Sequence, residues 1–131
     1  PPLEELGQVL TAEEVLRLQQ VARTVHVDES VLEYIVRIVQ ATREHREAYL
    51  GASPRGSIAL YRTSQAIALI RGREYVTPDD VKEMAPLVLA HRVILRPEAQ
   101  LRGIGAEGLV AEVLDQVPVP AGVKSYAARQ A

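Results

Sequence analysis

One predicted helix start carries residue types that could bind an anion. Ser53 is the expected N-cap and Pro54 the first helical residue, and Arg55 and Gly56 follow where other predicted helices carry acidic residues. A cation at the positive end of a helix dipole and a glycine within a helix are both unfavourable. Both are explained if an anion binds the free amides and the guanidinium group, with Gly56 letting it approach the backbone. The alternative is that Arg55 is a solvated surface residue or pairs with a carboxylate such as Glu47.

The other side chains that carry chemistry do not make up a complete active site. A P-loop needs Gly-Lys-Ser/Thr, whereas the only lysines, Lys82 and Lys124, both follow a valine. The three histidines are scattered and never paired at helical spacing, so we expect no metal site. The acidic pairs Glu13-Glu14 and Asp79-Asp80 occupy first helical turns, where carboxylates satisfy backbone amides. The sequence therefore predicts no self-contained enzyme.

Capping signals divide the chain into the helices that position these residues. Thr11 begins a capping box, and Asp28 is the expected cap of a second, longer helix. The third helix begins at Ser53, and Gly72 ends it. Thr77 begins the fourth helix, which has proline at its first position and acids in its first turn.

The pattern changes in the last third of the chain. Pro86 lies inside the fourth helical pattern and cannot continue the hydrogen-bond ladder, so we expect a kink or a break into two short helices. The β-branched run at 93–95 predicts a short extended segment. A last helix is predicted over 106–117. The predicted fold class is therefore all-α, a bundle of five to six helices with one short extended segment near 93–95.

Apolar periodicity predicts which helix faces are buried. The first helix carries an amphipathic stripe of Val15, Leu18, Ala22 and Val25. On the third helix, the side predicted to be most buried consists of Ala59, Thr63, Ala66, Ile67 and Ile70. Because Phe and Trp are absent and Tyr occurs five times, the core must be aliphatic.

Composition excludes several classes of protein. The 131 residues fit one domain, and 47% hydrophobic with 24% charged residues is ordinary for a globular fold. A net charge of -2 argues against nucleic acid or an anionic membrane as the main partner. There is no Cys, no apolar run long enough to span a membrane and no secretory signal at the start. We therefore expect a cytoplasmic protein.

Several segments together resemble the C-terminal part of MoxR-type AAA+ ATPases. The specific combination is Gly-Ala-Ser-Pro-Arg at 51–55 with Gly-Arg-Glu-Tyr-Val-Thr-Pro-Asp-Asp-Val-Lys at 72–82. Further matching segments are 41–43, 59–62, 88–92 and 117–120. The resemblance extends from about Leu3 to Pro120, which is nearly the whole chain.

The resemblance implies a role for the unusual helix start. In that family this region is the helical lid behind the nucleotide-binding domain, and Arg55 matches the sensor-2 arginine, a catalytic residue that reaches the γ-phosphate of ATP. Ser53 and Pro54 would fix the helix start that aims Arg55, so Ser53, Pro54, Arg55 and Gly56 are the expected ATP-binding residues. Arg43 matches a family position whose role the sequence leaves open; a cation at a helix C-terminus is the simpler interpretation.

The resemblance also implies a division into parts and a set of partners. We expect residues 1–10 to be a linker from an ATPase core domain, 11–120 the lid and 121–131 a flexible tail. ATP and Mg²⁺ would act in the full-length protein, whereas this fragment of an ATP hydrolase is expected to be inactive because it lacks the P-loop and Walker B residues. Expected partners are its own N-terminal core, neighbouring subunits of a ring and a protein with a von Willebrand factor A domain. The output would be chaperone-like remodelling or metal insertion.

Two other classes of function remain open at this point. The chain could be a helical nucleic-acid-binding module that uses its arginines, although it lacks a basic stripe and aromatic platforms. It could also be a protein-interaction bundle that binds no ligand. A DNA mobility assay at low salt tests the first of these, and an anion bound at the start of the third helix counts against the second.

Overall fold

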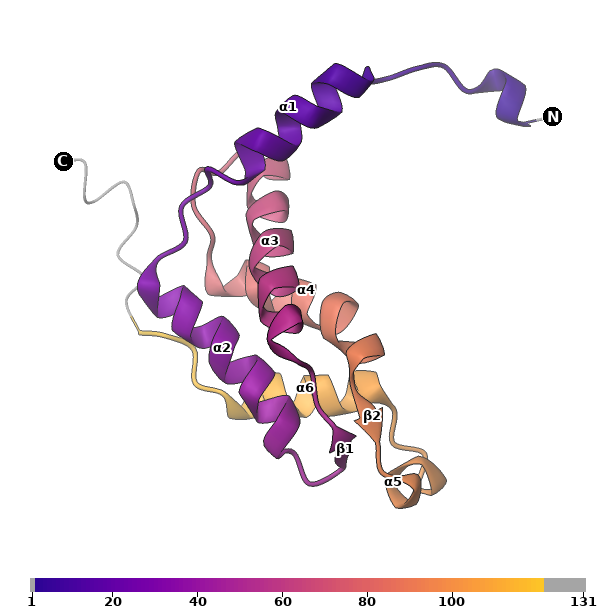
Figure 1. Cartoon of the computed structure of the whole chain (residues 1–131), viewed down its shortest axis with the longest axis vertical. Coiled ribbons are helices and arrows are strands. Elements are labelled where there is room, and N and C mark those ends of the chain that lie inside the picture. Colours follow the sequence, from indigo (N-terminus) through magenta and orange to yellow (C-terminus); the bar gives the residue numbers. More distant parts are fainter. Residues whose placement is uncertain (1, 122–131) are drawn as a thin grey trace.

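Ten short elements follow one another in the computed structural model, which describes residues 2–121 (Figure 1). The α-helices within this range are α1 (Ala12–Ala22), α2 (Glu29–Glu44), α3 (Pro54–Ile70), α4 (Pro78–Leu89), α5 (Pro97–Leu101) and α6 (Ala106–Gln116). The strands are β1 (Ala48–Leu50) and β2 (Ile94–Leu95), and the 3₁₀ segments are η1 (Pro2–Glu5) and η2 (Ala90–Arg92). The predicted all-α bundle of five to six helices is confirmed. The expected tail lies, apart from its first residue, outside the described residues.

Three of the predicted helix starts have the expected side-chain caps. At α1 the Thr11 hydroxyl accepts the amide of Glu14 at 3.1 Å, and the Glu14 carboxylate accepts the amide of Thr11 at 2.7 Å. Thr77 and Asp80 form the same reciprocal pair at α4. Asp28 accepts a first-turn amide of α2 at 3.0 Å. These bonds satisfy amides that have no partner within the helix, so they determine where each helix begins.

The predicted stop of α3 at Gly72 is confirmed. Gly72 adopts a left-handed conformation with φ of 73°, which glycine adopts at little cost. Its amide donates to the carbonyl of Leu69 at 2.8 Å, and the amide of Arg73 donates to the carbonyl of Ala68 at 2.9 Å. This is the Schellman pattern of helix termination. The turn reverses the chain and brings Arg73 to the start of α4.

The prediction at Pro86 is a kink or a break into two short helices. The helix α4 continues through Pro86 to Leu89, so the break does not occur, and the kink stays a prediction. Proline removes one amide from the ladder and crowds the preceding turn. The buried side chains of Val81 and Ala85 precede the proline, and that of Leu89 follows it. Because all three pack into the core, tertiary contacts offset the lost hydrogen bond.

A two-stranded antiparallel sheet lies at one end of the bundle (Figure 1). Its strand β2 confirms the extended segment expected near 93–95, whereas β1 and the short helix α5 were not predicted. The register pairs Ala48 with Leu95 and Leu50 with Ile94. This pairing joins segments that are far apart in the sequence, so no local pattern indicates it.

The helix α3 is central, and it packs against α1, α2 and α4. Its buried residues are Gly56, Leu60, Ser64, Gln65 and Ala68. The face predicted from apolar periodicity is therefore wrong, and Ile70 on that face is 78% exposed. The buried Gln65 side chain donates to the carbonyl of Val25 at 2.8 Å. This long-range hydrogen bond satisfies the buried side-chain amide. Apolar periodicity counts only apolar residues, so it does not predict that Gln65 is buried.

The helix α1 projects from the bundle and contributes no buried residue (Figure 1). Its predicted apolar stripe is present, but Val15 and Leu18 are exposed. Only Val25, which follows the helix, reaches the core. The segment before α1 extends further from the bundle and also exposes leucines, among them Leu3 and Leu6. A run of exposed apolar side chains is typical of an interaction surface.

Candidate functional site

The start of α3 is built from the four residues expected to bind an anion. Ser53 has the extended backbone of an N-cap (φ -81°, ψ 172°), but its side chain makes no capping hydrogen bond, which corrects the expected cap. Of the two amides that an N-cap side chain can bind, those of Arg55 and Gly56, the amide of Gly56 donates instead to the Ser53 carbonyl at 2.8 Å. Pro54 has no amide hydrogen. With these two backbone positions unable to donate to a ligand, anion binding here depends mainly on side chains.

The loop that precedes α3 is fixed against α2. The buried hydroxyl of Thr42 donates to the carbonyl of Val39 at 2.6 Å and accepts the amide of Ala52 at 3.0 Å. Gly51 lies so close to α2 that a Cβ there would fall 2.5 Å from the backbone nitrogen of Arg43. Two of the segments that carry the family resemblance therefore meet in space. Together they hold the helix start from which Arg55 projects.

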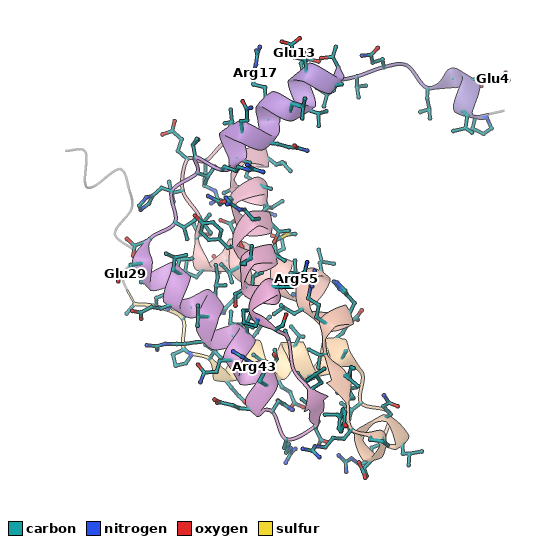
Figure 2. The ribbon with its side chains drawn as sticks, viewed as in Figure 1. Glu4, Glu13, Arg17, Glu29, Arg43 and Arg55 are labelled. Atoms are coloured by element: carbon teal, nitrogen blue, oxygen red, sulfur yellow. The ribbon has the colours of Figure 1, made fainter. Side chains whose placement is uncertain are left out.

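Arg55 is exposed at this helix start (Figure 2), and it lines a hollow of about 300 Å³. The residues that line the hollow are Arg55, Ile58, Ala59, Arg62 and Arg92. Within the described residues, none of the three arginines forms an ion pair with a carboxylate. The alternative pairing of Arg55 with Glu47 is wrong, because Glu47 binds Arg102 at 2.6 Å. The hollow therefore concentrates positive charge.

Reasoning from the sequence did not single out Arg62 or Arg92. Both lie in segments that carry the family resemblance, which is the signal that could have identified them. Arg62 lies two helical turns after Arg55 on α3, so its spacing could also have indicated it. The approach of Arg92 requires η2 to lie beside α3, and residue spacing does not encode that contact. Arg43, whose role the sequence leaves open, is exposed on α2 and does not line the hollow (Figure 2).

Gly56 is buried, although it lies next to Arg55. A Cβ at this position would lie 3.2 Å from the Cβ of Ala52 and 3.2 Å from Cδ2 of Leu89. The small residue therefore allows the first turn of α3 to pack closely against the end of α4. Contact of Gly56 with an anion stays a prediction.

A buried carboxylate anchors the start of α4, the helix that leads to Arg92. The Asp80 carboxylate accepts hydrogen bonds from both Nη atoms of Arg73, at 2.7 and 2.5 Å, and from the amide of Thr77 at 2.8 Å. Burial by itself raises the pKa of Asp80, but the hydrogen bonds from Arg73 and Thr77 outweigh burial, so the pKa is lowered overall. The α3–α4 turn is thereby locked to α4.

Acid should weaken this lock. Because the pKa of Asp80 is lower in the folded chain than in the unfolded one, its stabilisation is fully present above the unfolded value of about 3.9 and is lost as pH falls through the folded value. We therefore expect the Tm advantage of the unmodified chain over Asp80→Asn to shrink below about pH 4. Thermal unfolding followed by circular dichroism between about pH 7 and about pH 3 measures this advantage. An advantage that stays constant over this range contradicts the prediction.

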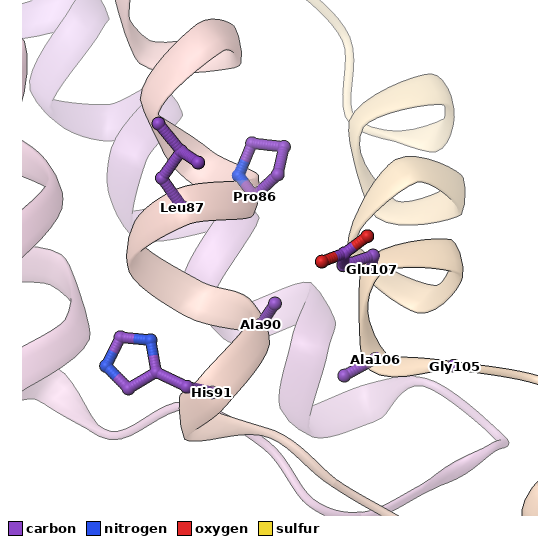
Figure 3. Close-up of a pocket in the computed structure, with 7 residues that line it drawn as sticks. All are labelled: Pro86, Leu87, Ala90, His91, Gly105, Ala106 and Glu107. Carbon is purple, nitrogen blue, oxygen red and sulfur yellow. The ribbon is translucent and has the colours of Figure 1, made fainter.

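A second hollow, of about 680 Å³, opens between the end of α4 and the start of α6 (Figure 3). Its walls are mostly small or apolar, and the ionisable side chains are His91 and Glu107. The His91 ring points away from the Glu107 carboxylate, so these two groups do not form a catalytic pair. In residues 2–121 no group of His, Asp and Glu side chains could hold a metal ion. No described helix is long and apolar enough to cross a membrane.

Comparison with known proteins relates this geometry to a family. The model of the AAA lid domain matches residues 40–113, which contain the whole three-arginine hollow. The uncharacterised protein YeaC of Bacillus subtilis is 49% identical over 119 residues, which are 91% of this chain and 37% of YeaC. Chaperone MoxR1 of Mycobacterium tuberculosis is 37% identical over 129 residues, with 92% of this chain and 34% of MoxR1 covered.

A solved structure shares the fold. The crystal structure of an inferred ATPase from Cytophaga hutchinsonii superposes with a TM-score of 0.79 at 34% sequence identity. The match covers 82% of this chain and 36% of that chain. The chain thus spans about a third of the length of each of these proteins.

Proposed function

Since the chain belongs to the AAA lid domain family, as the lid region of a MoxR-type AAA+ ATPase, we propose that it closes over ATP bound by a preceding core domain. Residues 1–10 link the two domains in this proposal, and residues 11–120 form the lid. The core supplies the P-loop and the acidic residues that hold Mg²⁺. The lid supplies Arg55, which acts on the γ-phosphate.

The observation that carries this proposal is an exposed arginine, Arg55, on a helix start that is firmly held. Among residues 2–121 it has no carboxylate partner. A guanidinium group stabilises the charge on a transferred phosphoryl group best when it needs no rearrangement to reach it. Thr42 and Gly51 hold the loop before α3, so Arg55 moves with the lid as one body. The missing counter-charge leaves the guanidinium available to phosphate.

The exposed apolar stripe of α1 supports contact with another domain. Val15 and Leu18 lie outside the core, and the segment before α1 adds further exposed leucines. We infer that the core domain covers part of this surface, since contiguous exposed apolar side chains favour association. Opening and closing about residues 1–10 would then carry Arg55 to and from the nucleotide and pass its state to neighbouring subunits of a ring.

The output of the complete machine is part of the same proposal. The relative MoxR1 is named a chaperone, which favours chaperone-like remodelling of a client protein in the cytoplasm. Metal insertion is the second output that the family resemblance implies. A partner with a von Willebrand factor A domain completes the proposed assembly.

The sensor role of Arg55 can be tested in the complete ATPase. We expect Arg55→Ala to lower kcat about 100-fold, because it removes a donor that acts mainly in the transition state. The KM for ATP should change much less than kcat. Steady-state ATP hydrolysis measures both constants, and gel filtration checks that the ring assembles.

A matched control is Arg37→Ala, which removes an arginine from the exposed surface of α2, where it pairs with Glu33 at 3.4 Å. This variant should keep kcat and assembly. If Arg55→Ala also assembles normally and keeps its turnover, the sensor role is wrong.

A further inference from the structure

The hollow at Arg55 holds two more arginines. Arg62 follows Arg55 by two turns on the same side of α3, and Arg92 reaches the hollow from η2. No carboxylate lines the hollow, and none pairs with these arginines within residues 2–121. Three cations that face one small space repel one another, and a bound anion relieves that repulsion.

Uncharged groups hold the two additional guanidinium groups. Nη1 of Arg62 donates to Oε1 of Gln65 at 3.2 Å, and its guanidinium carbon lies 5.3 Å from the ring centroid of Tyr61. Nε of Arg92 donates to the carbonyl of Val88 at 3.1 Å. A guanidinium group has five N–H donors. These contacts therefore orient both side chains and leave several donors for a ligand.

The number and type of these charges favour a polyphosphate. Arginine forks bind phosphate oxygens in pairs, and a polyphosphate presents several charged groups along a short chain. A single carboxylate would neutralise only one of the three arginines. We propose that Arg62 and Arg92 complete, with Arg55, a three-arginine site for the polyphosphate chain of a nucleotide.

This inference rests on the proposed function and deepens it by assigning different roles toward ATP to the three arginines. Arg55 stabilises the transferred phosphoryl group, whereas Arg62 and Arg92 bind the phosphate chain in both the ground state and the transition state. In the complete ATPase, Arg92→Gln should therefore raise the KM for ATP about tenfold and change kcat little. Arg55→Ala should instead lower kcat and change the KM for ATP much less.

Direct binding is measured on the 131-residue chain with inorganic tripolyphosphate as the probe. In an NMR titration, the Nε–Hε signals of Arg55, Arg62 and Arg92 should move together with one Kd. We expect Arg62→Gln and Arg92→Gln to weaken binding about tenfold each. The control Arg37→Gln removes the same charge from α2 and should weaken binding by less than about twofold. All these side chains are exposed, and thermal unfolding checks that each variant is folded.

Two results would overturn the three-arginine site. The first is an Arg92→Gln variant that binds tripolyphosphate no more weakly than Arg37→Gln. The second is a tetraglutamate peptide that binds as tightly as tripolyphosphate, because the hollow would then recognise acidic protein. Orthophosphate, which can contact fewer of the arginines, should bind more weakly than tripolyphosphate. If Arg55→Ala keeps its kcat while Arg92→Gln loses tripolyphosphate binding, the sensor role fails and the three-arginine site stands.

Discussion

Replacing Arg73 with alanine should lower the free energy of unfolding by about 3–5 kcal/mol. The side chain of Asp80 is only 1% exposed, and Arg73 binds both of its oxygens. Without Arg73, the nearest remaining cation is Arg71, 3.5 Å from Asp80 and already bound to Glu83 at 2.6 Å. The buried carboxylate must then keep a poorly compensated charge or take up a proton, and both cost stability. Urea unfolding of the chain measures the loss.

Arg17→Ala is the matched control for this prediction. Arg17 pairs with Glu13 at 4.0 Å on the exposed surface of α1, so its loss should cost less than about 0.5 kcal/mol. The double variant Arg73→Ala/Asp80→Asn should recover part of the stability, because it removes the buried charge as well. A loss for Arg73→Ala as small as that of the control contradicts the argument.

Gly51→Ala should destabilise the chain by about 3 kcal/mol, at the upper end for overpacking. The new Cβ would fall 2.5 Å from the backbone nitrogen of Arg43 and closer still to its Cα. These are backbone atoms of α2, so they cannot rotate away from the new Cβ as the end of a side chain can. The loop must therefore move, which strains the bond from the Ala52 amide to the Thr42 hydroxyl. Urea unfolding measures the cost.

The control for Gly51 is Gly108→Ala in α6. Gly108 is exposed, and a Cβ there would meet no atom within 4 Å. Alanine should therefore stabilise the helix by about 0.5–1 kcal/mol, because it restricts the unfolded chain and favours helix. Opposite signs for the two glycine substitutions are the expected result. If Gly51→Ala behaves like Gly108→Ala, close packing at Gly51 is not what requires the glycine.

The candidate site could be predicted only in part from the residues. The unusual charge at the start of α3 identified Arg55, because the equivalent first-turn positions of other predicted helices carry acidic residues. The cap expected from Ser53 was wrong, since the amide of Gly56 binds the Ser53 carbonyl instead. Sequence reasoning overlooked Arg62, although it lies two turns after Arg55 on the same helix. It could not place Arg92, because Arg92 comes from a different element.

Local sequence alone determined most of the helix boundaries. The reciprocal bonds at Thr11 and Thr77 and the left-handed turn at Gly72 involve residues within five positions of one another, so their spacing predicts them. Such contacts form within one turn of a helix and need no knowledge of the rest of the chain. The all-α class followed from these signals.

Only the tertiary structure decided which helix faces are buried and which charges are left without partners. Gln65 is buried because it binds the carbonyl of Val25, and Glu47 is unavailable to Arg55 because it binds Arg102. Each contact joins residues distant in sequence, and its strength depends on how whole elements pack and exclude water. The sequence therefore marked Arg55 as an anion-binding candidate, and helical spacing places Arg62 on the same side of α3. Packing alone brought Arg92 into the same hollow.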